Sequence, residues 1–125
     1  MEDYDSLSLE QNHRLGIGHF NAERFFPAHE AWETCWKQAK ETDEAEFFKG
    51  LSQLGAGYTH ILRGNQHGAF TLLRRGAGRI ERYEDGHRGV NVRELATAAM
   101  GLADRIEAAE QAGRPSPEVS FPKIA

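Results

Sequence analysis

Residues 25–36, which read FFPAHEAWETCW, place both tryptophans of the chain within about three helical turns. On a helix with about 100° per residue, one face collects three aromatic side chains, a histidine and a glutamate: Phe25, His29, Trp32, Glu33 and Trp36. Helices normally keep apolar and charged residues on opposite faces. A buried ionisable group costs several kcal/mol unless it is paired or hydrogen-bonded. The stretch therefore predicts a helix whose His29 and Glu33 find partners elsewhere in the chain.

The composition is typical of one soluble domain. The chain has 125 residues, of which 39% are hydrophobic and 27% charged, and its net charge is −4. Lys and Arg form no long basic run, so we expect neither nucleic acid nor a membrane surface as a partner. No apolar run approaches the roughly 20 residues of a membrane span, and the acidic start does not resemble a signal peptide. The single cysteine, Cys35, is expected to be a buried apolar side chain. We predict a cytoplasmic protein.

Helical periodicity runs along the chain, and no stretch shows the alternation of a strand. The expected helices run from Ser8 to about residue 20, from residues 24–26 to the polar connector 40–44, from about 45 to 62, from about 66 to 83, and from Asn91 to Gly113. Three cap signals support the helix starts: Ser8 with Gln11, Asn65, and Asn91 with Glu94.

The two ends of the chain are not expected to be helical. Residues 1–7 are predicted to be a loose N-terminus, and residues 114–125 a Pro-rich tail in which Phe121 and Ile124 lie against the helices. The sequence predicts a single all-α domain over residues 1–125, a bundle of about five helices with short antiparallel connections.

The third expected helix has two faces that look buried. One is an ordinary apolar stripe, and the other combines small residues with two polar ones: Gly50, Gln53, Ala56, Gly57 and His60. Because a glycine costs a helix about 1 kcal/mol relative to alanine, several on one face suggest that a bulky neighbour comes close. We predict that the aromatic face of the second helix packs there, with Gln53 and His60 directed towards His29 and Glu33.

Several motifs in this region form a recognisable set. They are FN at 20–21, FFxAHExWExxW at 25–36, FxGLxQ at 48–53, His60, and GNxxGA at 64–69. The set covers about residues 12–80 and resembles domain-of-unknown-function family 309, whose members are small all-helical proteins of bacteria and archaea. The resemblance implies a helical fold and a polar and aromatic signature, here His29, Glu30, Trp32, Glu33 and Gln53, with no activity attached. The chain departs from the family pattern at Pro27 and Lys49, where Glu and Gln are expected.

Three interpretations of the cluster follow. In the first, a buried hydrogen-bonded network fixes the second helix on the third in a structural or interaction domain; its members are His29, Glu30, Trp32, Glu33, Trp36, Gln53 and His60. In the second, His29, Glu33 and His60 bind a divalent metal in a hydrolase-like enzyme, with Glu30 as a candidate catalytic base. In the third, the aromatic rings line a pocket for a small molecule or peptide.

The remaining features carry weaker expectations. His67 and His87 lie in polar turns and are expected to be solvated, His19 is expected to be exposed, and no role is assigned to His13. A homodimer is possible, since two-fold dimers are the commonest oligomers.

Overall fold

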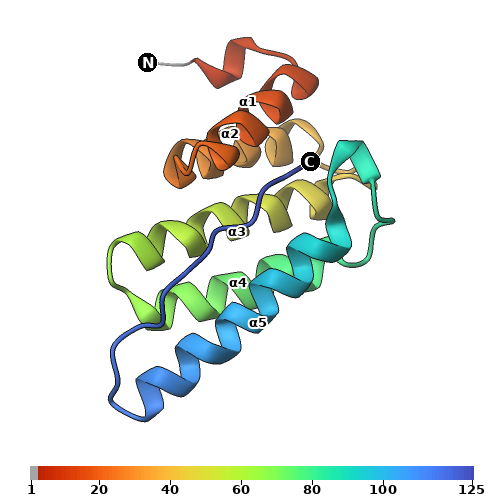
Figure 1. Cartoon of the computed structure of the whole chain (residues 1–125). Coiled ribbons are helices and arrows are strands. Elements are labelled where there is room, and N and C mark those ends of the chain that lie inside the picture. Colours follow the sequence, from red (N-terminus) through yellow and green to blue (C-terminus); the bar gives the residue numbers. More distant parts are fainter. Residues whose placement is uncertain (1–2) are drawn as a thin grey trace.

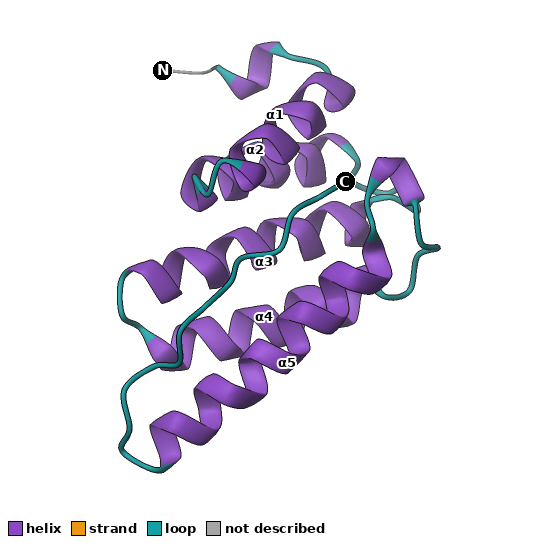
Figure 2. Cartoon of the chain, in the orientation of Figure 1, coloured by secondary structure: helices purple, strands orange, loops and turns teal. Residues whose placement is uncertain are grey.

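Five α-helices account for the regular structure of residues 3–125, the part of the chain that this computed structural model describes (Figures 1 and 2). They are α1 (Leu9–Asn21), α2 (Phe25–Gln38), α3 (Ala45–Leu62), α4 (Gln66–Ile80) and α5 (Val92–Gln111). Two short 3-10 turns, η1 (Tyr4–Ser6) and η2 (His87–Gly89), precede α1 and α5. Residues 3–125 contain no strand, so the predicted all-α bundle is confirmed. In this described part, no helix is both long and apolar enough to cross a membrane.

Each helix packs mainly against the next one in the sequence, and consecutive helices run antiparallel (Figure 1). α3 has α2 on one side and α4 on the other. Large rings fill the core between the helices, and the fully buried ones are Phe20, Phe25, Trp32, Phe47, Phe48 and Tyr58. Burying this much aromatic surface is the main favourable contribution to folding.

Local sequence signals mark three of the helix starts, two of them with a side-chain hydrogen bond to the helix backbone. Ser8 and Gln11 form both bonds of the predicted capping box at the start of α1. The Asn65 side chain accepts a hydrogen bond from the Gly68 amide at 3.0 Å and caps α4. Asn91 occupies the predicted N-cap position of α5, and its amide donates to the Glu94 carboxylate at 3.1 Å. Its side chain makes no hydrogen bond to the backbone of α5 and also binds the backbone of the C-terminal tail.

The small-residue face of α3 packs against α4, and the prediction that α2 covers it is wrong. A Cβ on Gly50 would lie 2.7 Å from Ile80, and a Cβ on Gly57 would lie 2.9 Å from Leu73. Gly55, on another side of α3, is the residue that lets α2 approach, since its Cβ would lie 3.0 Å from the His29 backbone nitrogen. Both neighbours of α3 come close at glycines, and the pattern alone does not say which neighbour meets which glycine.

Both ends of the described chain are held against the bundle. Asn12 Nδ2 donates to the Tyr4 carbonyl at 2.9 Å, which fixes η1 in the segment expected to be loose; residues 1 and 2 lie outside the described residues. The tail, residues 114–125, runs back across α3 to the α1–α2 turn (Figure 1). Its Phe121 ring lies 4.9 Å from that of Phe25, and Ile124 is only 4% exposed, so the predicted tail contacts are confirmed.

Candidate functional site

His29 lies in α2 and is fixed by α3. Its Nδ1 is 3.0 Å from the Ser52 carbonyl oxygen and 2.8 Å from Ser52 Oγ, which itself donates to the His29 carbonyl at 3.1 Å. Because a carbonyl only accepts hydrogen bonds, the geometry assigns the ring proton to Nδ1. The other ring nitrogen, Nε2, is thereby directed away from α3 and towards Glu33.

Glu33 pairs with His29 as the spacing of four residues predicts. His29 Nε2 lies 3.2 Å from Glu33 Oε2, and Lys37 Nζ lies 3.5 Å from the other carboxylate oxygen. The side chains of His29 and Glu33 are 26% and 43% exposed, so the pair is open to solvent rather than buried. Ion pairs this exposed contribute about 0–1 kcal/mol to stability, which is too little to fix the packing of two helices.

A small pocket opens between α2 and α3 beside this pair, and we call it the Trp36 pocket. Its lining residues are Glu33, Trp36, Lys49, Ser52 and Gln53. Its volume is about 160 Å³. The Nζ atoms of Lys40 and Lys49 each lie 5.3 Å from the centroid of the Trp36 ring, within cation–π range. Neither lysine forms an ion pair with any residue in 3–125.

Gln53 lies on the α4 side of this pocket. Its Oε1 accepts a hydrogen bond from Arg79 Nη1 at 3.1 Å, and the Arg79 guanidinium also pairs with Glu46 at 3.3 Å. The bond to Arg79 sets the orientation of the amide, because only the oxygen can accept. The Gln53 amide nitrogen is left without an acceptor among the residues that the structure describes.

Two predicted site residues lie outside the Trp36 pocket. His60 is eight residues beyond Ser52, about 12 Å along the α3 axis, and its Nδ1 is 3.2 Å from Asn65 Nδ2. Glu30 is exposed on α2 and lines a second pocket, which it shares with Glu33 and Lys37. Within residues 3–125, no three His, Cys, Asp or Glu side chains converge in a way that could hold a metal ion. The predicted three-ligand set of His29, Glu33 and His60 is therefore not formed.

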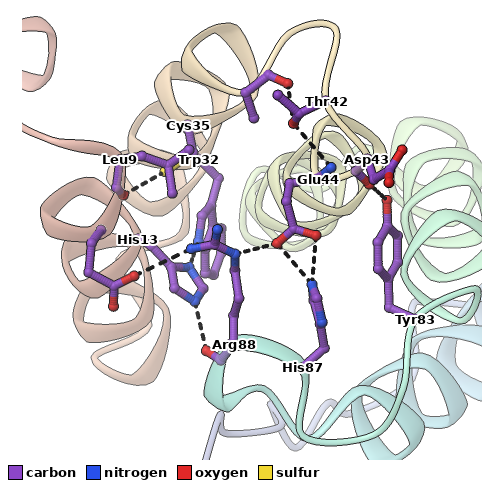
Figure 3. A network of polar contacts seen from close by, with 12 residues as sticks. Leu9, His13, Trp32, Cys35, Thr42, Asp43, Glu44, Tyr83, His87 and Arg88 are labelled. Atoms are coloured by element: carbon purple, nitrogen blue, oxygen red, sulfur yellow. Dashed lines mark hydrogen bonds and ion pairs between the residues drawn. The ribbon is translucent and has the colours of Figure 1, made fainter.

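Trp32 belongs to a second, buried network centred on His13 (Figure 3). Trp32 Nε1 donates to His13 Nδ1 at 3.1 Å, and His13 Nε2 lies 3.0 Å from the Arg88 carbonyl, to which it donates. Burial lowers the pKa of His13 and outweighs the hydrogen bond to the Arg88 carbonyl, which raises it. Both ring nitrogens of this neutral histidine are hydrogen-bonded, and the bonds join α1 to α2 and η2. The closed, buried network that we expected around His29 therefore lies around His13.

The turn η2 adds an ion-pair cluster at the edge of that network (Figure 3). Glu44 accepts hydrogen bonds from Arg88 Nε and, at 3.0 Å, from His87 Nε2. Partial burial alone would raise the pKa of the Glu44 carboxyl, but the hydrogen bonds and charges of Arg88 and His87 together lower it. The expectation that His87 is simply solvated is wrong, because its ring also lies 4.7 Å from that of Phe47.

Cys35 is buried beside the His13 network, as predicted. Burial raises the pKa of its thiol to about 12, so the thiol is protonated near neutral pH.

A wider cleft of about 550 Å³ lies between the end of α4 and α5. Three carboxylates, those of Glu81, Glu84 and Asp85, dominate its charged lining, and it contains none of the predicted site residues. We therefore place the candidate site at the Trp36 pocket and the adjoining His29–Glu33 pair.

The fold and this site define a small helical bundle with an open polar and aromatic site between its second and third helices. A family model described as "Domain of unknown function (DUF309)" matches residues 13–72, the segment that contains every predicted site residue. The match confirms the resemblance that the motifs predicted, over residues 13–72. A search of the curated proteins found no match.

Proposed function

We propose that this protein is a ligand-binding domain that takes a small organic anion in the Trp36 pocket. The observation that carries the proposal is a set of unused hydrogen-bond donors around the partly buried ring of Trp36. The ammonium groups of Lys40 and Lys49 and the amide nitrogen of Gln53 have no acceptor among the described residues. Lys37 Nζ lies 3.5 Å from one oxygen of the Glu33 carboxylate and offsets part of its negative charge.

The size and chemistry of the pocket narrow the class of ligand. A volume of about 160 Å³ is below the roughly 300–1,000 Å³ of sites for drug-sized molecules, so it fits a single ring or a short chain. The Trp36 ring supplies an apolar contact surface, and Lys49 supplies a charge for a carboxylate. An aromatic carboxylate combines these two properties.

The location of the stabilising contacts also supports a binding role. The fully buried Trp32–His13 bond secures α1 on α2, whereas the His29–Glu33 pair faces solvent. Groups whose contribution to stability is small are free to serve recognition. Ser52 holds the His29 ring in one orientation through Nδ1 and leaves Nε2 available for other contacts. This keeps the polar side of the site rigid.

The test compares benzoate with its neutral analogue benzamide, followed by NMR at the Trp36 indole N–H. We expect saturable shifts with benzoate, much weaker ones with benzamide, and loss of the benzoate response in Lys49→Gln. Arg75→Gln is the matched control, because it removes one positive charge from an exposed position of α4 outside the Trp36 pocket. Equal binding of both probes, or an unchanged response in Lys49→Gln, would show that the pocket does not select anions.

A divalent metal at the His29–Glu33 pair is a second candidate. A histidine that donates Nδ1–H to a backbone carbonyl and presents Nε2 has the usual arrangement of a metal ligand. The 3.2 Å between Nε2 and Oε2 suits two ligands that each lie about 2.1 Å from one ion. Calorimetric titration with zinc tests this candidate: binding that is present in the unmodified protein and absent in His29→Ala supports it, and no binding to the unmodified protein rejects it.

A further inference from the structure

Two asparagines hold the backbone of the tail in the same way. Asn21 Nδ2 donates to the Ile124 carbonyl at 2.8 Å, while its Oδ1 accepts the Ile124 amide at 2.7 Å. Asn91 Nδ2 donates to the Lys123 carbonyl at 3.0 Å, while its Oδ1 accepts the Ala125 amide at 3.2 Å. Each side-chain amide thus uses both its donor and its acceptor on one extended segment. The Asn91 side chain also binds the Glu94 carboxylate at 3.1 Å, but it makes no hydrogen bond to the backbone of α5.

Side-chain contacts accompany these backbone bonds. The Phe121 ring lies 4.9 Å from the ring of Phe25 and 5.7 Å from that of Tyr58. Ile124 is almost fully buried, and Lys123 Nζ lies 3.1 Å from Glu23 Oε2. The surface formed by Asn21, Glu23, Phe25, Tyr58 and Asn91, which we call the tail groove, therefore contacts an aromatic, a basic and an aliphatic side chain in that order.

We propose that the tail groove is a peptide-recognition site that the chain's own residues 121–125 occupy, and that it accepts an extended segment of the same pattern from another protein. Bonds from a side-chain amide to backbone N–H and C=O groups recognise extended chain whatever its sequence. Neighbouring contacts to the side chains of Phe121, Lys123 and Ile124 then supply specificity, as in other grooves that bind extended peptides. This inference is independent of the Trp36 pocket.

The tail is attached in a way that permits its release. Residues 113–116 are exposed, and the side chain of Ser116 makes one hydrogen bond, to Gln66. The tail also leaves the groove incompletely satisfied. Tyr58 is fully buried in the groove wall, yet its hydroxyl has no hydrogen-bond partner among the described residues. An unpaired buried hydroxyl costs about 1–3 kcal/mol, so a segment that supplies an acceptor would bind better than the tail does.

The first experiment uses the unmodified, ¹⁵N-labelled chain and an unlabelled synthetic peptide of residues 115–125. The linked tail has an effective concentration on the order of millimolar, so the peptide is added to several millimolar. We expect the labelled signals of residues 121–125 to move to the positions of an unbound segment, while the Asn21 and Asn91 side-chain signals keep their bound positions. Labelled tail signals that do not respond to the peptide would overturn the proposal.

A second experiment weakens the competing tail within the full chain. In Ile124→Ala, the same peptide should bind about tenfold or more tightly than it binds the unmodified protein, because the linked competitor is weaker. A peptide in which the residue equivalent to Phe121 is alanine is the matched control and should bind neither protein. Equal binding of the control peptide, or no gain in Ile124→Ala, would show that the groove does not recognise the segment.

Discussion

Protonation of His13 should destabilise the folded protein, and the geometry of the ring gives the reason. In the folded state Nδ1 accepts from the Trp32 indole and Nε2 donates to the Arg88 carbonyl. A proton on Nδ1 would point at the Trp32 indole N–H, so the hydrogen bond between these two groups would be lost. The charged ring would also be buried without a carboxylate in contact. The charges that act on His13 are Glu10, which favours its protonation, and Arg88 and His87, which oppose it.

The sign and size of the effect follow from linkage. The pKa of His13 is lowered in the folded state from its ordinary value of 6.5, which applies to the unfolded chain. Below pH 6.5, His13 binds a proton in the unfolded chain but stays neutral in the folded protein. The contribution of His13 to the free energy of unfolding is therefore complete above pH 6.5 and is lost as pH falls towards the folded pKa. The free energy of unfolding should decrease by up to about 1.4 kcal/mol per pH unit in this window.

Urea unfolding followed by circular dichroism between pH 7.5 and 5 measures this slope. His13→Gln is the matched variant, because glutamine stays neutral and can both accept and donate hydrogen bonds. The variant should be less stable at pH 7.5 and should lose the His13 part of the slope. The pKa of Glu44 is below its ordinary 4.5, so its own titration lies outside the window. Parallel pH profiles of the two proteins would refute the assignment of His13 as a buried neutral histidine.

Three further changes test the packing and the candidate site. Gly16→Ala should lower the free energy of unfolding in urea by about 1–3 kcal/mol, because its Cβ would lie 2.6 Å from the buried Trp32 indole. Gly18→Ala should instead stabilise α1 by up to about 1 kcal/mol, because its Cβ would have nothing within 4 Å. Equal effects would contradict the tight α1–α2 contact. Glu33→Gln should change stability by less than about 1 kcal/mol in the same assay, since the pair is exposed. If Glu33→Gln lowered the free energy of unfolding by several kcal/mol, as the loss of a buried network would, Glu33 would have a structural role.

The helices were predictable because their signals are local. The capping box of Ser8, the cap at Asn65 and the tolerance of Pro27 in a first turn each depend on a few neighbouring residues. Asn91 shows the limit of such signals. The same amide that can cap a helix can bind a distant backbone, and the tail, more than thirty residues further along, competes for it successfully.

The pairing of site residues was less predictable, because one face of a helix can meet several neighbours. The spacing of His29 and Glu33 correctly predicted their contact, which lies within one helix. Their partner across the interface is Ser52, whereas the adjacent Gln53, about 100° round the helix, contacts Arg79 of α4. The assignment depends on the rotation of α3, which its two sets of glycines leave undetermined.

One feature of the sequence could have predicted that His13 is buried. It lies three residues before Gly16 on the same face of α1, and a glycine inside a helix suggests that a bulky side chain comes close. Trp32 is that side chain, and its indole N–H needs an acceptor when buried. A histidine beside the glycine is a ready acceptor. The two tryptophans therefore differ: Trp32 is fully buried, whereas Trp36 is partly buried and lines the pocket.

Lys49 gives the proposed anion preference a basis particular to this chain. It stands where the resemblance leads us to expect glutamine, and it lies beside Trp36 without an ion-pair partner among the described residues. An ammonium group in the pocket lining adds attraction for an anion. A relative with glutamine at this position would keep the aromatic wall and the His–Glu pair but lose the charge. Relatives of the two kinds should therefore share a fold and a pocket while differing in the charge of the ligand they prefer.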